Sequence, residues 1–340
     1  MPSLKTALDY VAAQATGPVH GVLFLRMEEY HVLLSILKSD IAKHWGITVA
    51  GNAPTKIQIA HSGKCQSRLW CWADDAQPVI FLAASDERKT FEHAIRRLYT
   101  FLSPHICRAF ARTTDFHTAI GRIVGKKIKL RILQYVAKGR DDDRGSRKTI
   151  RTTQKWTDED YVTVFDRLNE EEQWLCSLRC EVSDASFTAI GRMWRNGEFL
   201  IEKGLQLFYR SLIRSYSEVI VSQMGLFTAR DQRTSPSHCS RPILIDYSKK
   251  EIFQNRAENA RLVAVLRQLN GISISVLHPN PYLQASIVDF DDGSGYTLWV
   301  TDPASLILVP QQKATASSLQ RICDHICEHF SEGVISEIDG

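Results

Sequence analysis

The chain has 340 residues, enough for two ordinary domains or one large one. Its composition, 44% hydrophobic and 24% charged, excludes a disordered or fibrous chain. The most apolar runs have the length of strands rather than membrane spans, and the first ten residues lack the apolar core of a secretory signal. Eight cysteines without such a signal predict reduced thiols and a cytoplasmic location.

The N-terminal third is predicted to mix helices and strands. Helices are expected over 3–14, over 28–44, and from Ser85 or Asp86 to Pro104, which cannot continue a helix. Four runs rich in apolar or aromatic residues predict strands, at 20–26, 56–60, 68–72 and 78–83.

A strand is predicted over 127–136, where apolar and basic residues alternate. The even-numbered residues from Ile128 to Gln134 are expected on one face of the strand. The basic residues are expected on the other face: Lys127, Lys129 and Arg131.

This strand is expected to lead into a charged loop over 139–146 and then into an acidic helix. Two glycines and mixed charges predict the loop. Thr157 is the expected N-cap of the helix, because Asp158 and Glu159 would then fall in its first turn.

The C-terminal half carries the clearest turn signal. Asn196-Gly197 predicts a hairpin between strands at 187–194 and 198–203, because both residue types tolerate a positive φ. Helices are expected over 205–215, over 250–269, and from Ser317 or Ser318 to about residue 330. Five further strands are predicted, at 242–247, 272–277, 284–290, 296–301 and 305–309.

These elements predict an α/β or α+β protein with two mixed lobes. An N-terminal α/β lobe is expected over 1–125 and a C-terminal α/β lobe over 181–340. The basic strand-loop and the acidic helix would join them over 126–180.

Positive charge is concentrated between Arg122 and Lys155. This stretch has twelve basic and three acidic side chains, a net charge of +9; because the whole chain is +4, the remainder is −5. Concentrated positive charge is what holding a polyanion requires. Eleven of the basic residues are candidate nucleic-acid contacts: Lys126, Lys127, Lys129, Arg131, Lys138, Arg140, Arg144, Arg147, Lys148, Arg151 and Lys155. Tyr135 and Trp156 are candidates to stack on bases.

Two other interpretations of the basic stretch remain open. It can be a solvated loop that is neutralised by the acidic helix. It can also meet an acidic protein or lipid surface.

Cysteine and histidine pairs superficially suggest metal sites. The last predicted helix carries two pairs at a spacing of four, Cys323 with Cys327 and His325 with His329. Both cysteines fall on or beside an apolar stripe and His325 points away, so buried thiols are expected instead of a metal site. Cys176 and Cys180 lie among apolar residues and are interpreted in the same way. No metal or cofactor is expected.

Two patterns offer a nuclease as the alternative function. Arg112 and His117 have the Arg-x4-His spacing and resemble the motif of HEPN ribonucleases. Five aspartates near predicted strand ends are candidates to bind Mg²⁺ for phosphodiester cleavage: Asp246, Asp289, Asp291, Asp292 and Asp302. Aspartate is also common at such ends because it accepts local backbone hydrogen bonds.

The segment from Leu283 to Gly293 resembles the strand motif of the phospholipase D superfamily, His, one residue, Lys, four residues, Asp. Gln284 stands at the His position, Ser286 at the Lys position and Asp291 at the Asp position. Because neither Gln nor Ser can supply the nucleophile or the phosphate-binding cation, the resemblance implies a non-catalytic domain.

The leading hypothesis is a nucleic-acid-associated binding protein without a catalytic centre of its own, acting within a larger complex. DNA and RNA are both open as ligands. A metal-dependent nuclease and a protein-interaction scaffold are the alternatives, and neither a membrane nor a small-molecule ligand is expected.

Overall fold

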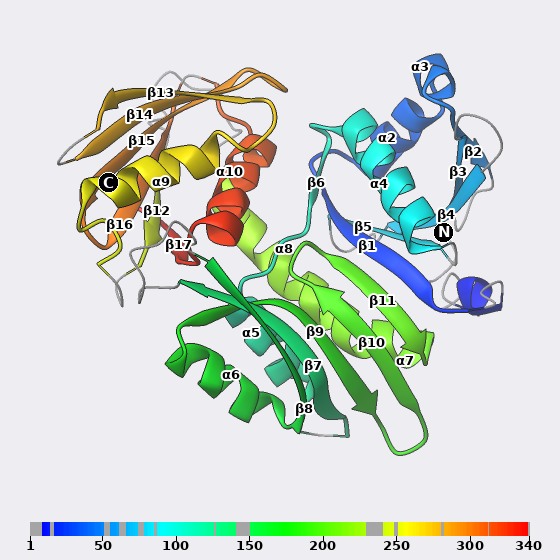
Figure 1. Cartoon of the computed structure of the whole chain (residues 1–340). Coiled ribbons are helices and arrows are strands. Elements are labelled where there is room, and N and C mark those ends of the chain that lie inside the picture. The colour runs from blue at the N-terminus through cyan, green and yellow to red at the C-terminus, as the bar shows by residue number, and fades with distance from the viewer. Residues whose placement is uncertain are drawn as a thin grey trace. The chain divides into compact units, whose positions relative to one another are not determined.

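The computed structural model in Figure 1 describes most of the chain. The described residues are 9–13, 17–50, 55–60, 66–73, 78–84, 87–125, 127–140, 150–228, 241–247, 251–279, 282–311 and 313–338. The chain forms two compact units, Met1–Ser222 and Gln223–Gly340, each with a sheet of its own. Helices and strands occur in both, so the predicted α+β class is confirmed. Among the described helices, none is both long and apolar enough to cross a bilayer.

The first unit is built on an eleven-stranded antiparallel sheet. Ten strands follow one another in the order β2 (Ile47–Ala50), β3 (Thr55–Ala60), β4 (Gln66–Ala73), β5 (Val79–Ala84), β1 (Val19–Arg26), β11 (Glu198–Lys203), β10 (Thr188–Trp194), β9 (Gln173–Ser183), β7 (Lys129–Arg140) and β8 (Ile150–Glu159). The short β6 (Ile106–Arg108) pairs with β1. Strands from all three segments expected from the sequence, 1–125, 126–180 and 181–340, therefore share this sheet.

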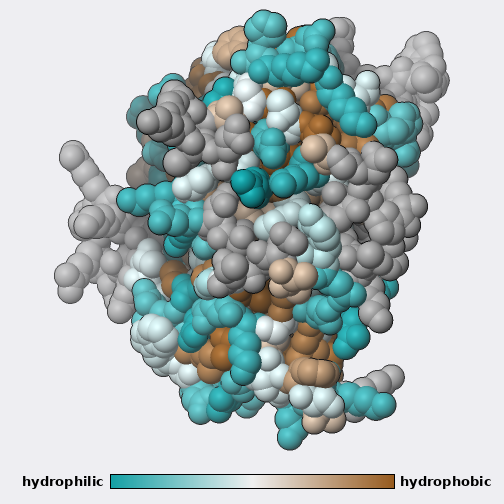
Figure 2. Space-filling view, turned by 90° about the vertical axis from the view of Figure 1, so that its right-hand side faces the viewer, coloured by the Kyte–Doolittle hydropathy of each residue, from teal (hydrophilic) through white to brown (hydrophobic). Residues whose placement is uncertain are grey.

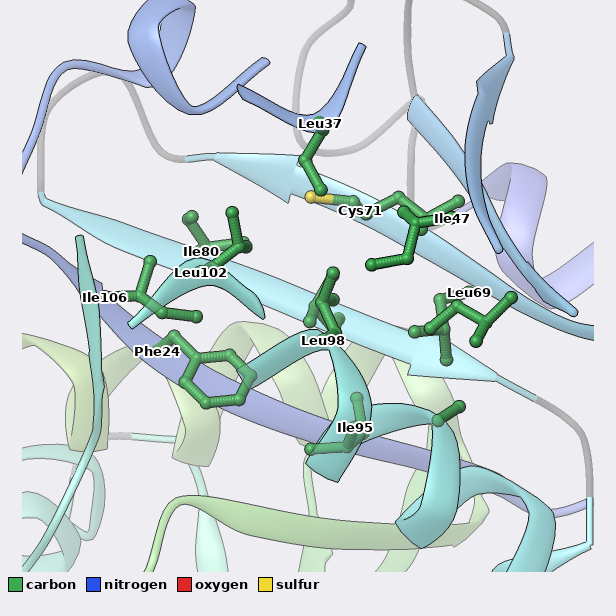
Figure 3. Packing of buried hydrophobic residues seen from close by; sticks show 14 of the residues in the cluster. Phe24, Leu37, Ile47, Leu69, Cys71, Ile80, Ile95, Leu98, Leu102 and Ile106 are labelled. Carbon is green, nitrogen blue, oxygen red and sulfur yellow. The ribbon is translucent and has the colours of Figure 1, made fainter. Parts of the chain in front are cut away.

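The N-terminal part of the sheet packs against α2 (Tyr30–Leu37), α3 (Asp40–His44) and α4 (Arg88–Leu102). Figure 3 shows this core, in which Leu98 and Ile95 of α4 lie over Leu69 and Ile80 of the strands. The single helix predicted over 28–44 is wrong, because Ser39 interrupts it. The Ser39 hydroxyl accepts a hydrogen bond from the Ala42 N–H at 3.2 Å and thereby caps α3 as a separate helix.

The other part of the sheet packs against α5 (Thr113–Ile123), α6 (Tyr161–Glu170), α7 (Leu205–Phe208), the π-helix η1 (Tyr209–Ile213) and the start of α8 (Arg214–Thr228). These helices lie on the opposite face from α4. Ile80 and Leu82 belong to the α4 core, whereas Phe81, between them in β5, contacts Tyr209 of η1. Successive strand residues face opposite sides, so the two helix groups cover different faces.

Two sequence predictions around β8 are wrong. Gly139 and Arg140, expected in a loop, continue β7, while 141–146 lie outside the described residues. The acidic helix does not start at Thr157, because β8 runs to Glu159 in pairing with β7. Asp160 is the cap instead, and its Oδ1 accepts from the Thr163 N–H at 3.0 Å.

Close packing of α7 on the sheet depends on Gly191 in β10. A Cβ atom at this position would lie 2.7 Å from the buried ring of Phe208 and 2.8 Å from the Leu200 carbonyl oxygen. We expect Gly191→Ala to lower the free energy of unfolding by about 1–3 kcal/mol, measured by urea denaturation. Gly121→Ala is the control, because nothing lies within 4 Å of that Cβ in α5. Alanine there should stabilise by up to about 1 kcal/mol, and equal losses in both variants would contradict the close contact.

The second unit has a six-stranded antiparallel sheet. Its order is β13 (Ile272–His278), β14 (Leu283–Asp289), β15 (Ser294–Asp302), β16 (Ser305–Pro310), β12 (Ile243–Asp246) and β17 (Val334–Glu337), and its helices are α9 (Arg256–Leu266) and α10 (Ala316–His329). The five strands predicted here are confirmed, and β17 is an addition. The helix predicted over 250–269 is shorter because Asn255 caps it, accepting from the Ala257 N–H at 2.9 Å.

The surface is mixed in hydropathy. Figure 2 shows hydrophobic patches between hydrophilic residues on one face of the molecule. Scattered apolar surface of this kind is ordinary for folded proteins, so hydropathy alone does not mark a site.

Candidate nucleic-acid interface

The basic stretch forms a hairpin at the edge of the first sheet. β7 and β8 pair in antiparallel register from Ile132 opposite Glu159 to Arg140 opposite Ile150. The connection 141–149 lies outside the described residues, and its sequence has three acidic and three basic residues. The net positive charge therefore comes from the strands and from the residues before β7.

A β-bulge at Leu133 changes which side chains of β7 share a face. Ile132 lies opposite Cys180, whereas Gln134 lies opposite Arg179, so Leu133 is the extra residue. The prediction that Gln134 and Ile132 share one face of the strand is therefore wrong. Beyond the bulge the even-numbered residues change sides and lie on the same face as Lys129 and Arg131.

The result is a sheet face, here called the basic face, that gathers cations from three strands. Its members are Lys129, Arg131, Gln134 and Lys138 of β7, Trp156 of β8, Arg179 of β9, and Arg192 and Trp194 of β10. One cross-strand row runs from Trp156 through Gln134 and Arg179 to Arg192. α5 to α8 pack against the other side of the sheet (Figure 1).

Aromatic rings accompany these cations. Trp156 is 70% exposed. The centroid of the Trp194 ring lies 5.6 Å from the Arg192 Cζ and 5.4 Å from the Arg88 Cζ. The Arg192 guanidinium also donates a hydrogen bond to the Gln134 side-chain oxygen. Arginine stacked on an aromatic ring keeps a fixed orientation, so its remaining N–H groups point in defined directions.

Acidic side chains neutralise part of this charge. Arg131 lies 3.0 Å from Asp158 and 3.3 Å from Glu181. Arg179 donates to both carboxylate oxygens of Glu202, at 2.8 and 2.6 Å.

Other cations of the segment differ in their environment. Lys155 lies on the opposite face, where its Nζ is 3.0 Å from Glu171 at the end of α6, and this contact raises the pKa of the lysine. The expected contact with the acidic helix is present at Lys155. Lys127 and Lys129 are exposed and form no ion pair with another described residue.

The eleven candidate contacts are thus only partly brought together. Lys127, Lys129, Arg131 and Lys138 lie on or next to the basic face, and Arg140 is half-buried at the end of β7. Lys126, Arg144, Arg147, Lys148 and the side chain of Arg151 lie outside the described residues. Sequence reasoning missed Arg179 and Arg192, which come from strands far along the chain.

The Arg112 and His117 pair is occupied by other contacts. Arg112 precedes α5, and its Nε lies 3.2 Å from Asp115, which is 5% exposed. The His117 ring packs against Phe165 and Tyr161 of α6, with ring centroids 5.2 and 5.8 Å apart. The two side chains therefore point to different neighbours.

The five C-terminal aspartates do not gather at one point. Asp289 ends β14, and Asp291 and Asp292 lie in the turn after it. Asp302 ends β15 and Asp246 ends β12, at the opposite end of these strands, about 26 Å away at the rise of a strand. Several accept local hydrogen bonds, as Asp302 does from the Ala304 N–H at 2.6 Å. Among the described residues, no three acidic, histidine or cysteine side chains form a group that could hold a metal.

The segment that resembles the phospholipase D motif lies on β14 and the turn after it. Gln284 and Ser286 are half-buried on one face of β14. Asp291 forms an ion pair with Arg321 of α10. The carboxylate at the Asp position is therefore engaged by an arginine of the chain itself.

The cysteine and histidine pairs of α10 have structural surroundings. Cys323 and Cys327 are fully buried, which confirms the expected apolar stripe. The Nε2 of His325 lies 2.9 Å from the Val265 carbonyl oxygen of α9, and burial lowers the pKa of this histidine. Cys180 is buried in β9, and Cys176 is half-buried.

No family model matches the chain, and no curated protein is significantly similar to it. Function must therefore be inferred from the residues themselves.

Proposed function

We propose that this chain binds single-stranded nucleic acid on the basic face. The observation that carries the proposal is the gathering of cations and an exposed tryptophan on one sheet face by the Leu133 bulge. Single-strand binding needs a positive surface that follows the backbone and aromatic rings on which bases stack. Trp156, open to solvent beside the row of cations, has the properties of such a ring.

The charge balance of the face predicts moderate, salt-sensitive binding. Six cations lie on or beside it, and three carboxylates pair with some of them: Lys127, Lys129, Arg131, Lys138, Arg179 and Arg192 against Asp158, Glu181 and Glu202. An excess of about three charges should give a slope of roughly −2 in a plot of log affinity against log salt, because each neutralised phosphate contributes about 0.7.

The test is fluorescence anisotropy with labelled single-stranded DNA and RNA at several salt concentrations. The double variant Lys129→Gln/Lys138→Gln should weaken binding at least tenfold and reduce the slope by about 1.4. The matched control is Lys38→Gln/Lys43→Gln, which removes the same charge from exposed sites at α2 and α3. Equal weakening by both variants would mean that binding follows total charge, and the basic face would then lose its role.

Trp156→Ala tests stacking separately. Loss of one base stack should weaken binding by about 1–3 kcal/mol while leaving the salt slope unchanged. A duplex of the same sequence should bind less well than the single strand, because its bases cannot stack on the ring.

We further propose that the protein is cytoplasmic, works in a complex and leaves catalysis to its partners. Probes recovered after the binding experiment should be intact with and without Mg²⁺. If the probes are cut and Asp291→Ala abolishes this cleavage, the nuclease alternative replaces the binding proposal.

A further inference from the structure

A pocket lies at the edge of the first sheet, on the side covered by α7 and η1, where three segments of the first unit meet, and it adjoins the basic face at Lys129. Its volume is about 860 Å³, within the range of ligand sites. The start of β7, the β9–β10 turn and the segment α7–η1 form its walls. The side chains that matter here are Lys127, Lys129, Phe187, Leu207 and Arg210. Lys129 belongs to both the pocket and the basic face.

The β9–β10 turn holds Phe187 at the pocket, and the Asp184 carboxylate stabilises this turn. The Asp184 Oδ1 accepts the N–H groups of Ser186 and Phe187, each at 2.8 Å. These donors hold the pKa of Asp184 below its ordinary value. The carboxylate stabilises the turn and also lines the pocket, where its charge interacts with Arg210. Phe187 remains 69% exposed.

The π-helix η1 presents Arg210. In this segment the side chains of Tyr209, Leu212 and Ile213 are buried against the sheet, and Arg210 is exposed at the pocket. The Ser211 hydroxyl donates to the Leu207 carbonyl at 2.5 Å, which satisfies an acceptor of the widened turn. Single π turns in longer helices are often found at functional sites.

Three cations, one carboxylate and an exposed ring surround this pocket, and the excess of positive charge fits a nucleotide with a terminal phosphate. We propose that the pocket binds such a nucleotide at the end of a strand, with the phosphate against Lys127, Lys129 and Arg210 and the base on Phe187. A terminal phosphate carries a charge of about −1.5 to −2 at neutral pH, more than a backbone phosphodiester. The inference rests on the proposed function and names the part of the strand that the pocket recognises.

The experiment compares oligonucleotides that differ at one end only. Competition anisotropy would use 5′-phosphate against 5′-hydroxyl and 3′-phosphate against 3′-hydroxyl versions of one single strand. We expect one phosphorylated end to bind about tenfold more tightly than its hydroxyl counterpart. Arg210→Gln should reduce this preference to less than threefold while hydroxyl-ended strands bind as before. Phe187→Ala should weaken binding of the phosphorylated strand through loss of the base stack.

Arg214→Gln is the matched control, because Arg214 is also exposed, one turn along the same helix, and does not line the pocket. It should retain the preference. Equal binding of phosphorylated and hydroxyl ends by the unmodified protein overturns the pocket proposal and leaves binding on the basic face intact. If no oligonucleotide binds, the proposed function fails, and a titration with adenosine monophosphate decides the pocket. If the protein binds adenosine monophosphate and Arg210→Gln abolishes this binding, the pocket remains a nucleotide site. If adenosine monophosphate does not bind, the pocket proposal is overturned.

Discussion

Replacing Phe81 by alanine should lower the free energy of unfolding of the first unit by about 3–5 kcal/mol. Phe81 is 1% exposed and lies in the aromatic cluster between the sheet and η1. Its ring stacks on Phe199 at 4.8 Å, contacts Trp72 at 3.8 Å, and meets Tyr209 edge-on at 4.8 Å between centroids. Alanine would leave a cavity, and the surrounding rings, held in two strands and a helix, cannot all move to fill it.

Urea denaturation followed by tryptophan fluorescence measures this loss. Phe187→Ala is the matched control, since the same atoms are removed from a side chain that is 69% exposed. That variant should change stability by no more than about 0.5 kcal/mol. A loss below 1 kcal/mol in Phe81→Ala would contradict a close-packed cluster at this position.

Asp289→Ala is expected to have an effect of similar size in the second unit, about 3–5 kcal/mol. Asp289 is 1% exposed, and its Oδ2 lies 2.5 Å from the Arg321 guanidinium and 2.6 Å from the Ser318 hydroxyl. Its Oδ1 accepts the Asp291 N–H at 3.0 Å. Removing the carboxylate would leave the partly buried Arg321 charge without its buried partner.

The control for this prediction uses the same guanidinium. Asp291 also pairs with Arg321, but its side chain is 46% exposed. Asp291→Ala should therefore cost about 1 kcal/mol or less. Thermal or urea unfolding of the two variants gives the comparison, and similar losses would show that burial does not set the strength of this network.

The sequence predicted elements best where one local rule was sufficient. The hairpin at Asn196-Gly197 formed as expected, and Gly197 has the positive φ, 77°, that the turn favours. β9 was not recognised. Its buried residues Trp174, Leu175, Ser177, Leu178 and Cys180 come in adjacent pairs, as on a helix. A bulge in the pairing with β7 causes this spacing, and alternation between neighbouring residues cannot reveal it.

The candidate interface was predictable only as a segment. Charge counting found Lys129 and Arg131, yet it also included Lys155, which faces the other side of the sheet. Arg192 and Arg210 carry no local signal, because tertiary pairing and the π turn place them. Local patterns therefore indicate which residues are charged, and long-range pairing determines which charges meet.

The bulge in β7 has a consequence for how this protein can change over evolution. Deleting Leu133 would remove the bulge and leave Lys138 on the basic face, because Gln134 would then follow Ile132 in regular alternation. Deleting Val136, beyond the bulge, would exchange the two sides of the strand after it, so that Lys138 would face the helices. Substitutions that keep the chain length, and loss of the bulge residue itself, leave the cations together, whereas an insertion or deletion of one residue beyond the bulge separates Lys138 from Lys129 and Arg131. Divergence in relatives should therefore be judged first by gaps within this strand and only then by the identity of its residues.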